Sequence, residues 1–213
     1  MKKIVIILSL VLVGVSSYAA GDKKQKSNYP KIKLGVEGGL NIANVFYGNS
    51  GSSIPYKFTL TWHGGVYAPI NFNDKLVFQP EVLYSVKGVT VSNFYTAHLN
   101  YIEMPLLIKY SIGKQFKVLG GVYLAYLVNS STNLETSVTY QKVQNTTPQG
   151  NRVDVGSVIG VEYEWENGLN AGVKYTQGFH NTDPNHGVGF SQNYNLVFSL
   201  YVGWTFIKFS GNR

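Results

Sequence analysis

The sequence predicts an all-β fold, an eight-stranded antiparallel up-and-down barrel, on three observations. Apolar and polar residues alternate in eight separate runs, the connections between runs are alternately short and long, and no run has a helical period. The clearest run lies between Leu99 and Val128, where the alternation continues on both sides of the turn Gly113–Gln115. Because successive side chains of a strand point to opposite faces, this stretch predicts a hairpin with two unlike faces.

The first thirty residues are unlike the rest of the chain. Met1 to Ala20 has a basic start, an apolar core from Ile4 to Val15 and small residues at its end, which is typical of a secretory signal peptide. The apolar core is too short to cross a bilayer as a helix. We expect cleavage after Ala19, so that residues 1–19 form the signal peptide, residues 20–30 a periplasmic lead-in and residues 31–213 the barrel.

The expected strands follow in order from this lead-in. They cover residues 31–43, 59–70, 75–86, 99–112, 116–128, 153–165, 169–179 and 193–206. The connections 71–74, 113–115 and 166–168 are short, and Asn167-Gly168 is a strong hairpin signal. The connections 44–58, 87–98, 129–152 and 180–192 are long, and residues 129–152 alternate enough to extend a hairpin as an exposed ribbon. All short turns then lie at one end, as in transmembrane barrels of bacterial outer membranes.

The direction of the apolar face decides between a membrane barrel and a secreted, lipocalin-like barrel. Charged residues make up 14% of the chain, below the roughly 25% of soluble domains, so they cannot cover a soluble exterior. An eight-stranded barrel is also too narrow to hold so many large apolar side chains inside. The apolar face should therefore meet lipid, in the outer membrane of a Gram-negative bacterium with the N-terminus in the periplasm.

Aromatic residues on the apolar face are expected to form two girdles at the membrane interfaces. The girdle at the long-loop end would consist of Trp62, Tyr84, Tyr126, Phe179 and Tyr194. The girdle at the short-turn end would consist of Tyr110, Phe116, Tyr163, Trp165, Trp204 and Phe206.

One segment resembles a known family. The run Leu99-Asn100-Tyr101-Ile102-Glu103-Met104-Pro105-Leu106-Leu107-Ile108-Lys109-Tyr110, followed by a glycine-containing turn and Val118-Leu119-Gly120-Gly121-Val122-Tyr123, resembles the signature of PorT-like outer-membrane β-barrel proteins. The expected first strand, with Gly35-Val36-Glu37-Gly38-Gly39-Leu40-Asn41, is similar to the opening strand of that family. The resemblance implies an eight-stranded barrel of the OmpA or OmpX type, and one named relative serves a protein-secretion apparatus. The chain departs from the usual aromatic last residue, because Ile207 to Arg213 follow Phe206.

The polar face of the expected barrel carries a cluster of charges. Its expected members are Glu37, Glu81, Glu103, Lys109 and Lys174. If residues 87–98 close symmetrically, Glu81 faces Glu103, and two carboxylates in contact need a cation or a shared proton. Lys174 is the expected partner. The cluster favours an ion-pair network that fills the lumen over a proton or cation path.

Two prolines interrupt the polar face. Pro80 and Pro105 fall within expected strands and almost side by side in the same register. Proline cannot donate to a β-ladder, so we expect a bulge or missing hydrogen bonds there.

The composition limits the possible functions. The chain has no cysteine and no basic patch with interleaved aromatic residues, so thiolate chemistry is excluded and no nucleic-acid partner is expected. Removing Lys2 and Lys3 with the signal peptide lowers the net charge from +7 to +5, which suits contact with anionic outer-membrane lipid and glycolipid. No catalytic, metal or cofactor site is predicted.

Three functional interpretations remain. The first is a structural or interaction protein without an open pore, which binds a protein partner through its external loops. The second is an accessory component of envelope protein secretion or transport. The third is a lipid-modifying enzyme, for which His98, His180 and His186 lie in or beside external loops and His63 faces the lumen.

Overall fold

The computed structural model describes residues 31–48, 56–91, 95–136, 139–143, 152–179 and 192–209. The expected signal peptide (1–19) and lead-in (20–30) lie outside these residues. The strands are β1 Lys31–Gly48, β2 Tyr56–Lys57, β3 Thr59–Tyr67, β4 Ile70–Asn71, β5 Leu76–Val91, β6 Tyr95–Ile112, β7 Phe116–Thr136, β8 Thr139–Val143, β9 Val153–Glu164, β10 Leu169–Gly178 and β11 Gln192–Phe209. Within the described ranges, no helix is long and apolar enough to cross a membrane.

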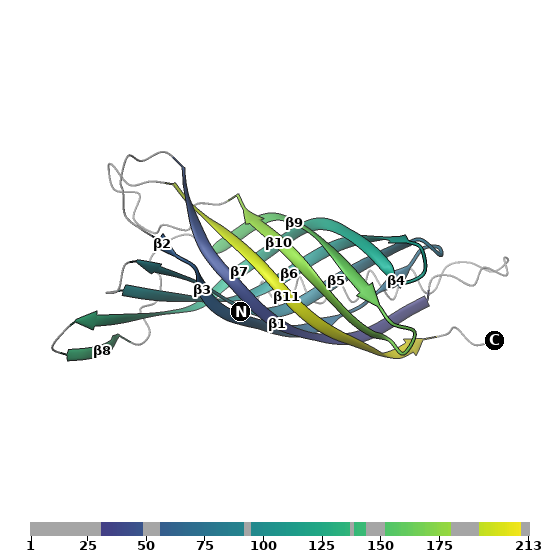
Figure 1. The fold of residues 1–213 in the computed structure, drawn as a ribbon, viewed down its shortest axis with the longest axis horizontal. Coiled ribbons are helices and arrows are strands. Elements are labelled where there is room, and N and C mark those ends of the chain that lie inside the picture. Colours follow the sequence, from purple (N-terminus) through teal and green to yellow (C-terminus); the bar gives the residue numbers. More distant parts are fainter. Residues whose placement is uncertain are drawn as a thin grey trace.

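The long strands form one closed antiparallel sheet (Figure 1). Their order is β11-β10-β9-β7-β6-β5-β3-β1, and β11 pairs with β1 to complete the ring. The β4–β5, β6–β7 and β9–β10 connections are short and lie at the right of Figure 1, at the end where β1 begins. The prediction of an all-β, up-and-down barrel is therefore confirmed.

One expected strand is divided. The run predicted at 59–70 is broken at Ala68 and Pro69 into β3 and β4, which pair successively with β1 and β5. The Ala68 N–H donates instead to the Pro80 carbonyl at 3.0 Å. The wall of the barrel is thus irregular at the short-turn end of this strand.

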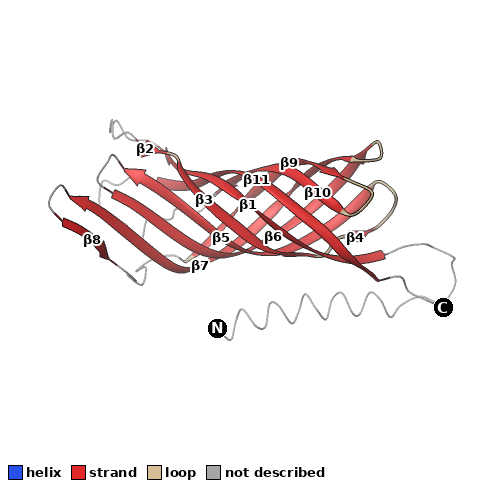
Figure 2. Ribbon diagram, turned by 60° about the horizontal axis from the view of Figure 1, so that its bottom comes forward, coloured by secondary structure: helices blue, strands red, loops and turns tan. Residues whose placement is uncertain are grey.

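The strands at the long-loop end extend further than the sequence predicts. β5 continues to Val91 and β6 starts at Tyr95, so most of residues 87–98 are paired strand rather than loop. β7 continues to Thr136 and pairs with β8, which gives the ribbon expected within residues 129–152. Figure 2 shows β7 and β8 reaching beyond the rest of the barrel. These extensions are rich in polar residues. They could not be distinguished from loops in the sequence, because strands and loops outside a membrane have similar compositions.

The two faces of the sheet differ as the alternation predicts. Outward residues are apolar and exposed, for example Ile159 at 60% and Leu200 at 48%. Inward residues combine charged and polar groups with a few large side chains such as Tyr123 and Leu107, which are 1% and 0% exposed. Among the described residues, the outward face of the long strands is apolar rather than charged, which is typical of a surface that contacts lipid.

Glycine allows close packing of the inward face. A Cβ on Gly121 would lie 2.1 Å from the Leu106 carbonyl oxygen, whereas a Cβ on the neighbouring outward Gly120 would meet nothing closer than 3.9 Å. Gly39 and Gly65 are restricted in the same way, by the carbonyl oxygens of Leu200 and Val82. These inward glycines let neighbouring backbones lie where a larger residue would separate them.

Candidate functional site: the charged lumen

A buried lysine on β10 joins two carboxylates from distant strands. The Lys174 ammonium donates to Glu37 Oε1 on β1 and to Glu81 Oε2 on β5, at 2.8 Å in each case. The other Glu81 oxygen accepts a hydrogen bond from the Gln79 amide at 2.8 Å. All three charged side chains are at most 6% exposed, so water screens this triad little.

A second triad surrounds Lys87. Its ammonium lies 2.9 Å from Glu103 Oε2 and 3.5 Å from Asp154 Oδ2. Asp154 also accepts hydrogen bonds from the Tyr123 hydroxyl and the Asn195 amide, at 2.8 and 2.7 Å. The Lys87 ammonium lies 4.4 Å from the centroid of the Tyr123 ring, a cation–π distance. This cluster joins β5, β6, β7, β9 and β11 across the lumen.

A third cluster lies toward the short-turn end. Lys109 donates to Glu162 Oε2 at 2.5 Å, and the Tyr201 hydroxyl donates to the same oxygen at 2.7 Å. Lys117 approaches Glu162 Oε1 at 4.0 Å and also pairs with Glu164. These residues lead to a polar vestibule of about 330 Å³ at the barrel mouth, where the short turns surround its opening.

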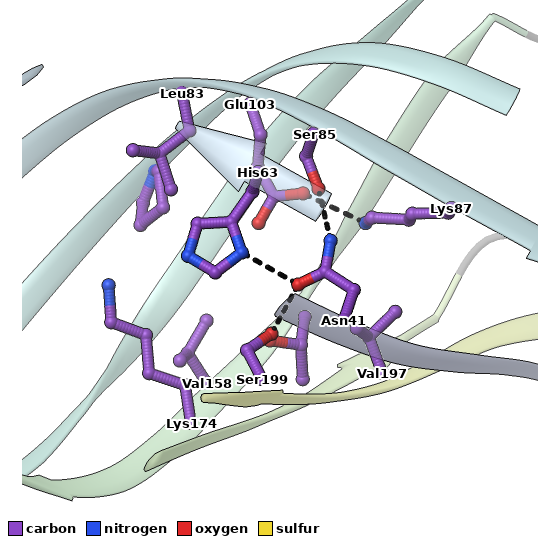
Figure 3. A pocket seen from close by; sticks show the side chains of 12 residues that line it. Asn41, His63, Leu83, Ser85, Lys87, Glu103, Val158, Lys174, Val197 and Ser199 are labelled. Atoms are coloured by element: carbon purple, nitrogen blue, oxygen red, sulfur yellow. Dashed lines mark hydrogen bonds and ion pairs between the residues drawn. The ribbon is translucent and has the colours of Figure 1, made fainter. Parts of the chain in front are cut away.

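His63 lies between the two triads and bonds a group of neutral side chains (Figure 3). Its Nδ1 lies 2.7 Å from the Asn41 side-chain oxygen, which also accepts a hydrogen bond from Ser199. The Asn41 amide nitrogen donates to the Val86 carbonyl at 3.1 Å. A cavity of about 20 Å³ is lined by His63, Lys174, Lys87 and Glu103, together with neighbouring polar and apolar groups.

The five charged residues expected in the lumen are all buried, but they do not form one group. Glu37, Glu81 and Lys174 form the first triad, Glu103 belongs to the second and Lys109 to the third cluster. The expected contact between Glu81 and Glu103 is wrong. The β5–β6 register instead places Leu83 opposite Glu103 and Val77 opposite Lys109, because the turn is centred one residue later than the assumed symmetrical closure.

Sequence reasoning missed five charged members of the clusters, which are Lys87, Lys117, Asp154, Glu162 and Glu164. Lys87 was assigned to a loop, although it continues the inward parity of Ser85 and lies in β5. The other four have the polar parity of the expected strands 116–128 and 153–165 but were not identified as cluster members. Their parity was an available signal, whereas their partners depend on the cross-lumen geometry.

The two prolines lie beside an interruption of the sheet. Pro80 pairs with Leu106, and the β5–β6 register then resumes at Leu83 and Glu103, so the positions between them have no ladder partner across this pair of strands. On its other side, Pro105 pairs regularly with Tyr123. The disturbance is therefore restricted to the β5–β6 seam and the β3–β4 break.

The residues expected in the aromatic girdles all lie on the outer surface, where they are exposed or half-exposed. Several are in mutual contact. The Trp62 and Tyr84 centroids are 5.6 Å apart near the long-loop end, and those of Tyr163 and Trp165 are 4.8 Å apart near the short turns. Their position at the two membrane interfaces stays a prediction.

The described residues offer little for catalysis. No group of three or more histidine, cysteine, aspartate or glutamate side chains among them could hold a metal ion. His63 is enclosed in the lumen and His98 is half-buried on β6, while His180 and His186 lie outside the described residues. The arrangement is suited to cross-linking the strands.

Three comparisons relate this chain to known proteins. Residues 23–183 match the family model described as outer membrane protein beta-barrel domain. No match was found among curated proteins. Among solved structures, neisserial surface protein A is 12% identical, with coverage of 81% of this chain and 97% of that chain and a TM-score of 0.49. Ail of Yersinia pestis is 9% identical (84% and 99%, TM-score 0.46), and OprG of Pseudomonas aeruginosa is 12% identical (86% and 99%, TM-score 0.39).

The family match covers most of the chain, and the closed antiparallel ring with an apolar exterior gives it a structural basis. The chain therefore belongs to the outer membrane protein beta-barrel domain family.

Proposed function

We propose that this protein is a closed-lumen barrel that binds a protein partner through the strand extension at its long-loop end. The observation that carries the proposal is the ribbon formed by β7 and β8. In this proposal the N-terminus and short turns lie in the periplasm, and the ribbon lies outside the cell. The protein has no catalytic role, and its exterior contacts outer-membrane lipid and glycolipid.

The strand lengths support a projecting binding element. A transmembrane strand needs about 9–11 residues, and β10 has 10 residues, whereas β7 has 21. β5 and β6 are also long, with 16 and 18 residues. Beyond a bulge between Asn100 and Tyr101, the excess length of β6 and β7 is paired as far as Tyr95 and Leu134, so it continues the sheet. A paired extension keeps a defined shape, which favours specific binding.

The edge of this extension offers a way to recognise an extended peptide. Among the described residues, β8 pairs with β7 on one side only. Thr136 and Thr139 close a two-residue hairpin, so Tyr140 and Lys142 direct their N–H groups away from β7. An exposed row of N–H and C=O groups is a template for strand addition.

The lumen supports the absence of a pore. The buried charged residues on the lumen face comprise five carboxylates and three lysines, and each lysine is paired with a carboxylate on a strand that is not its neighbour. Their cross-links occupy the path that an ion would take. With the lumen filled, partner binding would take place on the external surface at the long-loop end.

The proposal also includes that the protein is PorT-like. The run from Leu99 to Tyr110 and the strand that follows it support this identity. It makes an accessory role in envelope protein secretion or transport the alternative function. The two functions share the same binding surface and differ in the identity of the partner.

Photo-crosslinking in intact cells tests the proposal. A crosslinking residue at Gln141 should capture a discrete partner. Lys142→Pro removes an outward N–H without affecting the bonds to β7, so it should abolish capture, whereas Lys142→Ala should preserve it. Heat-modifiable gel migration would verify that both barrels are folded. Equal capture by both variants, or no captured partner with wild type, would contradict the proposal.

A further inference from the structure

The tautomer of His63 follows from its neighbours. The Asn41 amide nitrogen donates to a backbone carbonyl, the Val86 oxygen, which fixes the orientation of this amide. The Asn41 oxygen is therefore an acceptor, and His63 must donate to it from Nδ1. In the neutral ring, Nε2 consequently carries a lone pair and no proton.

This lone pair is buried and receives no hydrogen bond from the described part of the chain. His63 is 5% exposed, and its Nε2 makes no hydrogen bond with any described residue. The ring nitrogen lies 3.8 Å from Glu37 Oε1, the oxygen that Lys174 contacts at 2.8 Å. A buried acceptor without a donor is costly, by roughly 1–3 kcal/mol. Figure 3 shows Nδ1 directed at Asn41 and Nε2 directed the opposite way.

The adjoining cavity has the size and chemistry for one water molecule. Its volume of about 20 Å³ exceeds the roughly 10–15 Å³ that one water requires and is too small for two. Lys174 lines it, and only two of the three ammonium N–H groups are used by Glu37 and Glu81. Glu103 also lines it, and its carboxylate is a hydrogen-bond acceptor.

We infer that this cavity is a binding site for one structural water, which accepts from Lys174 and donates to His63 Nε2 and Glu103. Three hydrogen bonds match the usual number for a buried water. The water joins the Lys174 and Lys87 triads into one network through the centre of the barrel. A monovalent metal ion suits the site less well, because Lys174 and Lys87 both line the cavity and their positive charges repel a cation.

A high-resolution crystal structure of the mature protein, with a thallium(I) soak, tests the occupant. One density peak within hydrogen-bond distance of His63 Nε2, without thallium anomalous signal, is expected. An empty cavity would overturn the inference, and so would a thallium peak, which would identify a cation site. In a lipid bilayer at neutral pH, ¹⁵N spectra should show a protonated Nδ1 and an unprotonated, hydrogen-bonded Nε2. A doubly protonated ring would also refute the inference.

A matched pair of variants on β9 adds a second test. Val158 lines the cavity and is 2% exposed, so Val158→Ile should fill the space, remove the water peak and shift the Nε2 resonance. Val161 points outward at 44% exposure, and Val161→Ile should change neither signal. Retention of the peak and resonance in a folded Val158→Ile protein would contradict the assignment.

Discussion

Replacing Lys174 with methionine is the most direct perturbation of the lumen. Methionine has nearly the same length and removes the ammonium that joins Glu37 and Glu81. Both carboxylates would stay buried, without their shared cation and close to each other. We expect the barrel to keep its topology, because the backbone ladder is unchanged, but to unfold more readily.

The expected loss of stability follows from the contact distances. At 2.8 Å and an effective dielectric constant of about 20, each contact represents about 6 kcal/mol of attraction, which desolvation of the charges offsets in part. Removing one member of a buried ion pair typically costs about 3–5 kcal/mol. We therefore expect Lys174→Met to lower the free energy of unfolding by about 3–5 kcal/mol.

Urea unfolding from lipid vesicles, followed by tryptophan fluorescence, would measure this change. The matched control is Lys114→Met in the exposed β6–β7 turn, which should change stability by less than about 0.5 kcal/mol. Adding Glu37→Gln and Glu81→Gln to Lys174→Met removes the two unpaired carboxylate charges. This triple variant should recover most of the lost free energy of unfolding. The reasoning is refuted if Lys174→Met costs less than about 1 kcal/mol, or if the triple variant is no more stable than the single one.

Three further predictions concern packing, lipid contact and conduction. Gly121→Ala should lower the free energy of unfolding by about 1–3 kcal/mol in the same assay, while Gly120→Ala should be neutral or slightly stabilising, and equal effects would contradict the packing argument. Ile159→Arg, at mid-membrane, should lower the free energy of unfolding by about 2–4 kcal/mol, and Leu169→Arg, beside a turn, should lower it by about 0–1 kcal/mol. The reverse order would disprove the depth assigned to these residues. Wild type and Glu103→Gln should both lack stepwise conductance in planar bilayers, since the remaining cross-links still fill the lumen, and stable channels would show an open path.

The faces of the strands could be predicted from the sequence because alternation is a local property. Glu37, Glu81 and Lys174 were placed on the inward face by parity alone, and the structure buries all three. Apolar residues such as Ile159 and Leu200 were assigned to the outer face in the same way. Because side chains alternate between the two faces of a strand, the face of a residue depends only on its position along its own strand and not on the neighbouring strands.

Cross-strand partners could not be predicted as well, because they depend on the centre of each connection. Moving the centre of the β5–β6 turn by one residue changes the register by two positions, which preserves every face but exchanges every partner. This is why Glu103 lies opposite Leu83 and not Glu81. The extent of β5 was missed for another reason, since Lys87 and its neighbours have the composition of a loop.

The lumen network explains how the ring can close in a single register. All eight long strands contribute a side chain to the described cross-lumen contacts, and the Tyr67 hydroxyl on β3 bonds both Thr205 on β11 and Asn170 on β10. A slip of one residue in the pairing of any of these strands would turn the inward residues of that strand toward lipid. For β10 such a slip would expose Lys174 to the membrane, which would lower stability by roughly 2–4 kcal/mol. It would also leave Glu37 and Glu81 without their shared cation. The buried charges therefore act against misregistered barrels, which gives a charged lumen a structural role that does not depend on conduction.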